Sequence, residues 1–194
     1  MTYPTFTLSL PAWLTEAAMP SEHSLATIEA RMTFVIELAR RNSEAGTGGP
    51  FAAAVFDLTT HRLLAPGVNR VTTACCSSAH AEIVALSIAQ QRIGHYDLGG
   101  PGRPPYELVT STEPCAMCLG AVPWSGVRAL VCGARGDDAA AIGMDEGAKP
   151  ADWVAQLEQR GIRVTRDICR TAAASVLTQY QRSGGEIYNA RQAN

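Results

Sequence analysis

The chain has 194 residues, enough for one well-buried domain. Its formal net charge is −2 and only 18% of its residues are charged, so nothing in the composition points to a polyanionic partner. Residues 1–23 hold no lysine or arginine and are broken by three prolines, and no apolar stretch is long enough to cross a bilayer. We therefore expect a soluble cytoplasmic protein that binds neither membrane nor nucleic acid.

The first part of the chain predicts an arm, a helix and two strands. Residues 1–23 are expected to form an irregular arm carrying scattered apolar side chains. Helical spacing of apolar residues predicts an amphipathic helix over 24–44, which a glycine-rich segment ends. Short apolar runs bounded by turn residues predict strands over 51–58 and 62–71, the second broken at Pro66-Gly67.

The rest of the chain alternates between predicted helices and strands. A helix is expected to carry His80 and Glu82 and to begin at a serine cap, Ser77 or Ser78. A strand, helix and strand follow within 106–133, and so short a crossover implies parallel pairing. The last predicted elements are a helix over 151–160, a strand over 162–169, a helix over 171–182 and an apolar tail over 184–194. One α/β domain with helices on both faces of a sheet accounts for this order.

Four residues in two short runs carry the chemistry. His80, Cys115 and Cys118 offer one imidazole and two thiolates, which are three protein ligands for zinc. Catalytic zinc sites have three protein ligands and leave the fourth position to water, and Glu82 supplies a carboxylate where that water must lose a proton. The combination H-x-E…P-C-x-x-C is the signature of zinc-dependent deaminases of bases and nucleosides.

The local sequence explains the thiolates better than the carboxylate. Pro114 suits the first position of a helix, which places Cys115 and Cys118 on one face at its electropositive end. Residues two apart do not share a face of an ideal helix, so spacing alone does not bring His80 and Glu82 together. The alternative is a non-catalytic zinc module in which Cys75 or Cys76 is a fourth ligand.

Further runs of residues carry a family resemblance. The chain resembles the cytidine deaminase-like superfamily over about 45–183, through Gly48–Phe51, Asn69–Val71 and the two zinc motifs. These runs are also found in adenosine deaminases that act on transfer RNA. The segment Asp137–Gly147 and the tail Ile187–Arg191 are similar to bacterial guanine deaminases in particular.

The resemblance implies a fold, a cofactor and an assembly. The expected fold is a three-layer α/β/α cytidine deaminase-like domain with a central five-stranded mixed sheet, spanning residues 1–194. The implied partners are a small purine base and a second copy of the chain, in a homodimer whose C-terminal segments are swapped to close each other's sites. The implied cofactor is Zn²⁺ held by His80, Cys115 and Cys118, with Glu82 as the proton shuttle.

The resemblance also implies residues that contact the substrate. Glu146 corresponds to a second catalytic carboxylate, and the expected substrate contacts are Phe51, Asn69, Ala81, Asp138 and Tyr188. Structural alternatives exist for several of them: Glu146 as a solvated loop charge, Asn69 as a turn former and Tyr188 as an anchor for the tail. Met144 stands where relatives often have phenylalanine.

The expected reaction is hydrolytic deamination of guanine to xanthine and ammonia. Amino-triazines such as ammeline present a similar edge and are further candidate substrates. The alternatives are a transfer-RNA adenosine deaminase, another deaminase of small bases or nucleosides, or the structural zinc module described above.

Overall fold

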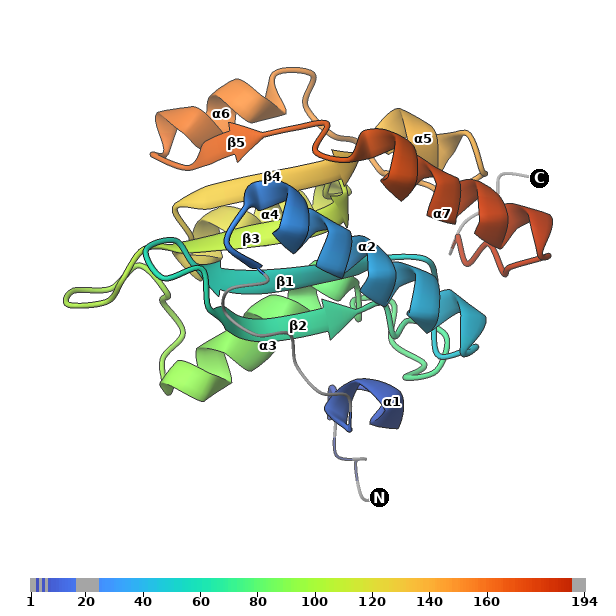
Figure 1. Cartoon of the computed structure of the whole chain (residues 1–194), viewed down its shortest axis with the longest axis horizontal. Helices are drawn as coiled ribbons and strands as arrows, with labels where there is room; N and C mark the ends of the chain where they lie inside the picture. Colours follow the sequence, from blue (N-terminus) through green and yellow to red (C-terminus); the bar gives the residue numbers. More distant parts are fainter. Residues whose placement is uncertain (1–2, 4, 6, 17–24, 190–194) are drawn as a thin grey trace.

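The computed structural model describes residues 3, 5, 7–16 and 25–189 (Figure 1). Five strands form one sheet: β1 (Ala52–Asp57), β2 (Leu63–Val68), β3 (Tyr106–Thr112), β4 (Ala129–Ala134) and β5 (Arg163–Thr165). The helices are α1 (Ala12–Thr15), α2 (Ile28–Glu44), α3 (Ala81–Ile93), α4 (Ala116–Ser125), α5 (Gly136–Ala140), α6 (Trp153–Gln159) and α7 (Arg170–Arg182). The remainder of the predicted arm and the end of the predicted tail lie outside the described residues.

The strands form a mixed sheet in the order β2-β1-β3-β4-β5. β1 runs antiparallel to both β2 and β3, whereas β3, β4 and β5 are parallel to one another. The parallel pairing predicted from the short crossover at 106–133 is therefore confirmed. β5 has only three residues, so the strand predicted over 162–169 is much shorter than expected.

Helices cover both faces of the sheet and enclose two hydrophobic cores (Figure 1). Alternate strand residues serve each face: Val109 and Val131 pack with α2 and α7, whereas Leu108 and Leu130 pack with α3, α4 and α6. This arrangement confirms the expected three-layer α/β/α fold of the cytidine deaminase-like type.

The edge strand β2 packs against α3, the helix that begins after His80 and carries Glu82. β2 continues through Pro66 and Gly67, which pair with β1, so the predicted break is wrong. Proline is tolerated there because an edge strand leaves one row of N–H groups unpaired. A Cβ on Gly67 would lie 2.4 Å from both Ala81 O and Ala85 N, so glycine is what lets α3 pack closely on the sheet.

Two helix starts differ from the sequence prediction. His80 itself is the N-cap residue of α3, in place of the expected serine. Cys115 is the N-cap of α4, so Pro114 precedes the helix instead of opening it. The segment Asp137–Gly147, for which no helix or strand was predicted, begins in the short helix α5. Within the described part of the chain, no helix is both long and apolar enough to span a membrane.

Candidate active site

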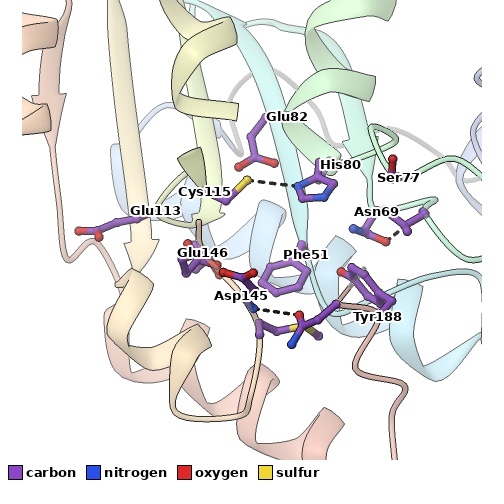
Figure 2. Close-up of a pocket in the computed structure, with 15 residues that line it drawn as sticks. Phe51, Asn69, Ser77, His80, Glu82, Glu113, Cys115, Asp145, Glu146 and Tyr188 are labelled. Atoms are coloured by element: carbon purple, nitrogen blue, oxygen red, sulfur yellow. Dashed lines mark hydrogen bonds between the residues drawn. The ribbon is translucent and has the colours of Figure 1, made fainter. Parts of the chain in front are cut away.

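The three predicted metal ligands converge at one point, and Figure 2 shows two of them, His80 and Cys115, facing each other. His80 Nδ1 lies 3.5 Å from Cys115 Sγ and 3.5 Å from Cys118 Sγ, and the three atoms lie within 4.8 Å of one another. Zinc bonds of about 2.0–2.1 Å to nitrogen and about 2.3 Å to sulfur, at tetrahedral angles, place ligand atoms about 3.5–3.8 Å apart. The donor set and its spacing therefore fit zinc.

The N-cap positions explain why these side chains meet. His80 and Cys115 both have extended backbone angles, so their side chains do not follow the helical repeat of α3 and α4. This is why Glu82, in the first turn of α3, enters the same site as His80 although the two residues are only two apart. The N-terminal ends of both helices are electropositive and favour thiolates at the site.

The pKa values of Cys115, Cys118 and Glu82 all differ from those of the free side chains. A hydrogen bond with Cys118 lowers the pKa of Cys115 to about 4, and the same contact raises the pKa of Cys118. Glu82 is only 6% exposed, and burial raises its pKa to about 7. A carboxyl group with this pKa accepts and releases protons readily at neutral pH.

A cavity of about 180 Å³ opens beside the metal ligands (Figure 2). Pockets for drug-sized ligands are typically about 300–1,000 Å³, so this volume suits a smaller molecule. Its walls bring together most of the predicted site residues: Phe51, Asn69, His80, Ala81, Glu82, Cys115, Glu146 and Tyr188. Cys118 is fully buried beneath them.

Asn69 is held in one orientation. Its Oδ1 accepts hydrogen bonds from the backbone N–H groups of Gly49 (3.3 Å) and Val71 (3.2 Å). The amide nitrogen is the end that faces the cavity (Figure 2). Asn69 therefore offers donors to a bound molecule, whereas the sequence left both donor and acceptor roles open.

Glu146 enters the cavity from the loop after α5. Its backbone carbonyl accepts a hydrogen bond from Ala116 N (2.9 Å), which ties this loop to the segment that carries Cys115. Within the described structure its Oε2 is buried and has no hydrogen-bond partner. Burial raises the pKa of Glu146 to about 7, against the opposing effect of the Lys149 charge.

The C-terminal tail forms one wall of the cavity. Tyr188 lines it and packs against Gly49, where a Cβ would lie 2.5 Å from the tyrosine hydroxyl oxygen. Asn189 fixes the tail to the Glu146 loop: its Oδ1 accepts from Asp145 N (2.9 Å) and its Nδ2 donates to Gly143 O (2.8 Å). Ala190 and Arg191, also part of the predicted tail motif, lie outside the described residues.

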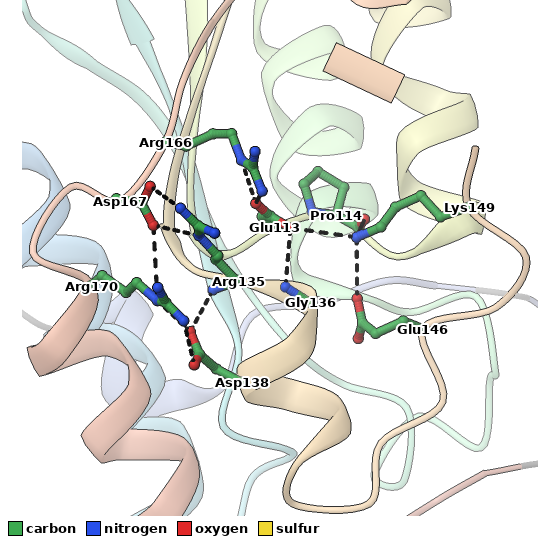
Figure 3. A network of polar contacts seen from close by, with 10 residues as sticks. All are labelled: Glu113, Pro114, Arg135, Gly136, Asp138, Glu146, Lys149, Arg166, Asp167 and Arg170. Carbon is green, nitrogen blue, oxygen red and sulfur yellow. Dashed lines mark hydrogen bonds and ion pairs between the residues drawn. The ribbon is translucent and has the colours of Figure 1, made fainter. Parts of the chain in front are cut away.

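Asp138 does not join the predicted substrate contacts. Its carboxylate accepts from Arg135 N (2.8 Å) at the start of α5 and pairs with Arg170 at 2.9 and 3.0 Å (Figure 3). Asp138 is therefore a helix-capping residue that joins α5 to α7. The reason is local: the segment turns into a helix, whose first N–H groups attract a carboxylate.

The closed, structural zinc site is not formed. Cys75 is exposed, and Cys76 Sγ lies 3.2 Å from Ser78 Oγ. Among the described residues, the candidate metal ligands that lie this close together are His80, Cys115 and Cys118 alone. A fourth protein thiolate therefore does not complete the site.

Sequence reasoning missed a group of residues behind the cavity. Thr112 and Glu113 line it from the end of β3, and Lys149 lies between Glu113 and Glu146 (Figure 3). The available signal for Glu113 was a charged residue at the end of an apolar strand, directly before Pro114 and Cys115. Lys149 could have been noticed because it is the only lysine in the chain.

Comparison with known proteins identifies the family. The family model of the cytidine and deoxycytidylate deaminase zinc-binding region matches residues 25–134, more than half of the chain. The chain belongs to this family of zinc-dependent deaminases, and His80, Cys115 and Cys118 form its candidate zinc site.

Within the family, the chain is similar to guanine deaminases and to a transfer-RNA adenosine deaminase. A structure of guanine deaminase from Nitrosomonas europaea is 50% identical, with a TM-score of 0.87, and the match covers 93% of this chain and 100% of that one. Guanine deaminase of Bacillus subtilis (strain 168) is 39% identical over 111 residues, 57% of this chain and 67% of that protein. A tRNA-specific adenosine deaminase of Buchnera aphidicola is 29% identical over 142 residues, 73% of this chain and 83% of that protein.

Proposed function

We propose that this protein hydrolyses guanine to xanthine and ammonia. The observation that carries the proposal is one small cavity that places the predicted zinc ligands His80 and Cys115 beside two carboxyl groups, Glu82, which is buried, and Glu146, which is partly buried. The similarity to guanine deaminases over nearly the whole chain supports guanine as the substrate.

The two carboxyl groups divide the proton transfers. Zinc, when bound, supplies a Lewis acid that activates water for attack on the amine-bearing carbon, C2 of guanine. Glu82 takes the proton that the water gives up and passes it to a ring nitrogen, which makes C2 electrophilic. Glu146 gives a proton to the departing amine, and the proton of the hydroxyl group on C2 restores Glu146 as the C2 carbonyl forms, so ammonia leaves and xanthine remains. A pKa of about 7 in both groups suits these roles near neutrality.

The remaining walls of the cavity hold the base. Asn69 directs amide donors into the cavity and recognises an edge of the base that carries acceptors, as the O6 and N7 edge of guanine does. Adenine replaces O6 by an amine and leaves such a donor unpaired, which costs about 1–3 kcal/mol. Phe51, Met144 and Tyr188 supply the apolar surface around the ring, and Ala81 contributes to the wall beside His80.

The assembly belongs to the same proposal. Residues 1–194 act as a single deaminase domain, in a homodimer in the cytoplasm whose tails close the cavities. Support comes from Tyr188 and Asn189 of the tail, which line the cavity and attach the tail to the Glu146 loop. A nucleic-acid partner is not part of the proposal, because the net charge is −2.

Ammonia release from a substrate panel tests the proposal. The panel is guanine, guanosine, adenine, cytosine, ammeline and a transfer-RNA stem-loop, each at the same concentration with zinc-loaded protein. Guanine should be preferred over adenine by about tenfold or more in kcat/KM, from the penalty of an unpaired donor. Equal turnover of adenine and guanine, or preference for the stem-loop, would replace the proposal by the transfer-RNA alternative.

A further inference from the structure

The only lysine of the chain lies behind the active site. Fifteen of the sixteen lysine and arginine residues of the chain are arginines. Lys149 is also shielded, because its side chain is only 14% exposed. A shielded ammonium group among carboxylates indicates a specific task, since lysine is mostly an exposed residue.

The ammonium group of Lys149 joins three parts of the site (Figure 3). Its Nζ donates to Pro114 O at 3.2 Å, directly before the zinc ligand Cys115. The same nitrogen lies 3.7 Å from Glu113 Oε2 and 3.8 Å from Glu146 Oε2. It also lies 5.6 Å from the centre of the Trp153 ring, a cation–π contact that holds it from behind.

The space for this cluster is built into the backbone. A Cβ on Gly136 would lie 2.9 Å from Lys149 Nζ and 3.5 Å from Glu146 Oε2. Gly136 is the first residue of α5 and does not have a positive φ, so these side-chain contacts, and not the backbone conformation, favour glycine there. A compact ammonium group fits such a place better than a planar guanidinium group.

Glu113 and Glu146 depend on the lysine to different degrees. Glu113 already accepts from Arg166 Nε (2.6 Å) and from Gly136 N (3.0 Å), so it is satisfied without Lys149. Within the described residues, Glu146 Oε2 has no hydrogen bond, and Lys149 Nζ forms an ion pair with it at 3.8 Å. The positive charge of Lys149 therefore matters most to Glu146.

We propose that Lys149 is a positioning residue for Glu146, an inference that rests on the proposed role of Glu146 as proton donor. When Glu146 gives its proton to the departing amine, it becomes a carboxylate in a buried place. Lys149 holds the side chain at the cavity wall and stabilises that negative charge. The hydrogen bond from Lys149 Nζ to Pro114 O fixes the ammonium group next to the segment that carries Cys115.

A double-mutant cycle on the zinc-loaded protein tests this role. Lys149→Met keeps the apolar stem and removes the charge, so kcat for guanine should fall about tenfold or more while KM changes little. In the Glu146→Gln background the same substitution should cost less than about twofold, because the group it serves is gone. Lys149→Arg should retain more activity than Lys149→Met, because it keeps the charge.

Arg166→Met is the matched control. Arg166 also pairs with Glu113 and lies 5.5 Å from the centre of the Trp153 ring, but its contacts do not include Glu146. Its effect on kcat should be the same in both backgrounds. Zinc content and thermal midpoint, measured on every variant, separate a folding defect from a positioning defect.

The NMR chemical shift of the Lys149 side chain distinguishes a positioning role from a purely structural one. Protein labelled with [¹³Cε]lysine gives one resonance, because Lys149 is the only lysine. Addition of 8-azaguanine should shift this resonance in the parent and leave it unchanged in Glu146→Gln. The experiment needs no substitution at Lys149, so it stands even if Lys149→Met does not fold.

The outcomes separate the two claims. If Glu146→Gln turns over guanine like the parent, the proposed proton donor is wrong and the role of Lys149 is wrong with it. If Glu146→Gln is impaired but the losses from Lys149→Met are additive, only the positioning role is overturned. If 8-azaguanine leaves the lysine resonance of the parent unchanged, the positioning role of Lys149 is also overturned.

Discussion

A single methyl group at Gly49 should open the cavity. A Cβ there would lie 2.5 Å from the Tyr188 hydroxyl oxygen and 2.8 Å from Tyr188 Cε1, well inside the ~3.5–4.0 Å of a normal carbon contact. Gly49 does not have a positive φ, so Gly49→Ala strains no backbone and acts through this contact alone. Overpacking of this kind costs about 1–3 kcal/mol.

The docked tail has little free energy to spare. The two hydrogen bonds of Asn189 contribute about 0.5–1.5 kcal/mol each, and burying an aromatic ring contributes about 1.5–3 kcal/mol. Ordering residues 186–189 costs about 1–2 kcal/mol per residue, which is of the same size. A clash of 1–3 kcal/mol therefore lowers the ratio of docked to undocked tails by roughly 5- to 150-fold.

Steady-state kinetics of Gly49→Ala on guanine measure this effect. KM should rise about fivefold or more, by the population shift above. The matched control is Gly120→Ala on α4, where a Cβ meets no atom within 4 Å and KM should stay at the parent value. In a Tyr188→Ala background, Gly49→Ala should add nothing. A parent-like KM for Gly49→Ala would refute the role of the tail as a wall of the cavity.

Three further predictions follow from the site. Cys118→Ala should remove zinc and activity together, as metal analysis and ammonia release will show; an active, metal-free variant would contradict the ligand assignment. Burial raises the pKa of Glu146 to about 7, so the group is protonated below that pH, and kcat should fall as pH rises through it; Glu146→Gln should lack this limb. Deleting residues 186–194 should raise KM for guanine, and the oligomeric mass of the truncated protein should be measured in the same experiment. Full activity of this variant would contradict the role of the tail as a wall of the cavity.

The sequence predicted the residues that chemistry constrains. His80, Glu82, Cys115 and Cys118 are recognisable because zinc and proton transfer allow few residue types at few spacings. Their convergence was not derivable, because it depends on His80 and Cys115 being N-cap residues outside the helical repeat. Local propensity favoured a serine at the start of α3, and tertiary placement decided otherwise.

Residues that act through packing were harder to predict. The strand β2 runs through Pro66 and Gly67 because it lies at an edge of the sheet and against α3, and neither fact is visible in one sequence. Asp138 was expected to contact the substrate, but its carboxylate caps the helix α5 instead. Lys149 gave no motif at all, because its role comes from segments that meet only in the folded chain.

Product analysis of a matched pair of proteins tests the central claim most directly. The parent and Glu82→Gln are brought to the same zinc content, given guanine, and assayed for xanthine and ammonia. The parent should form the two products in equal amounts, whereas Glu82→Gln should retain its zinc and lose at least ~10²-fold in kcat, the scale of a lost acid–base group. Parent-like turnover by zinc-loaded Glu82→Gln, or no xanthine from the parent, would contradict the account.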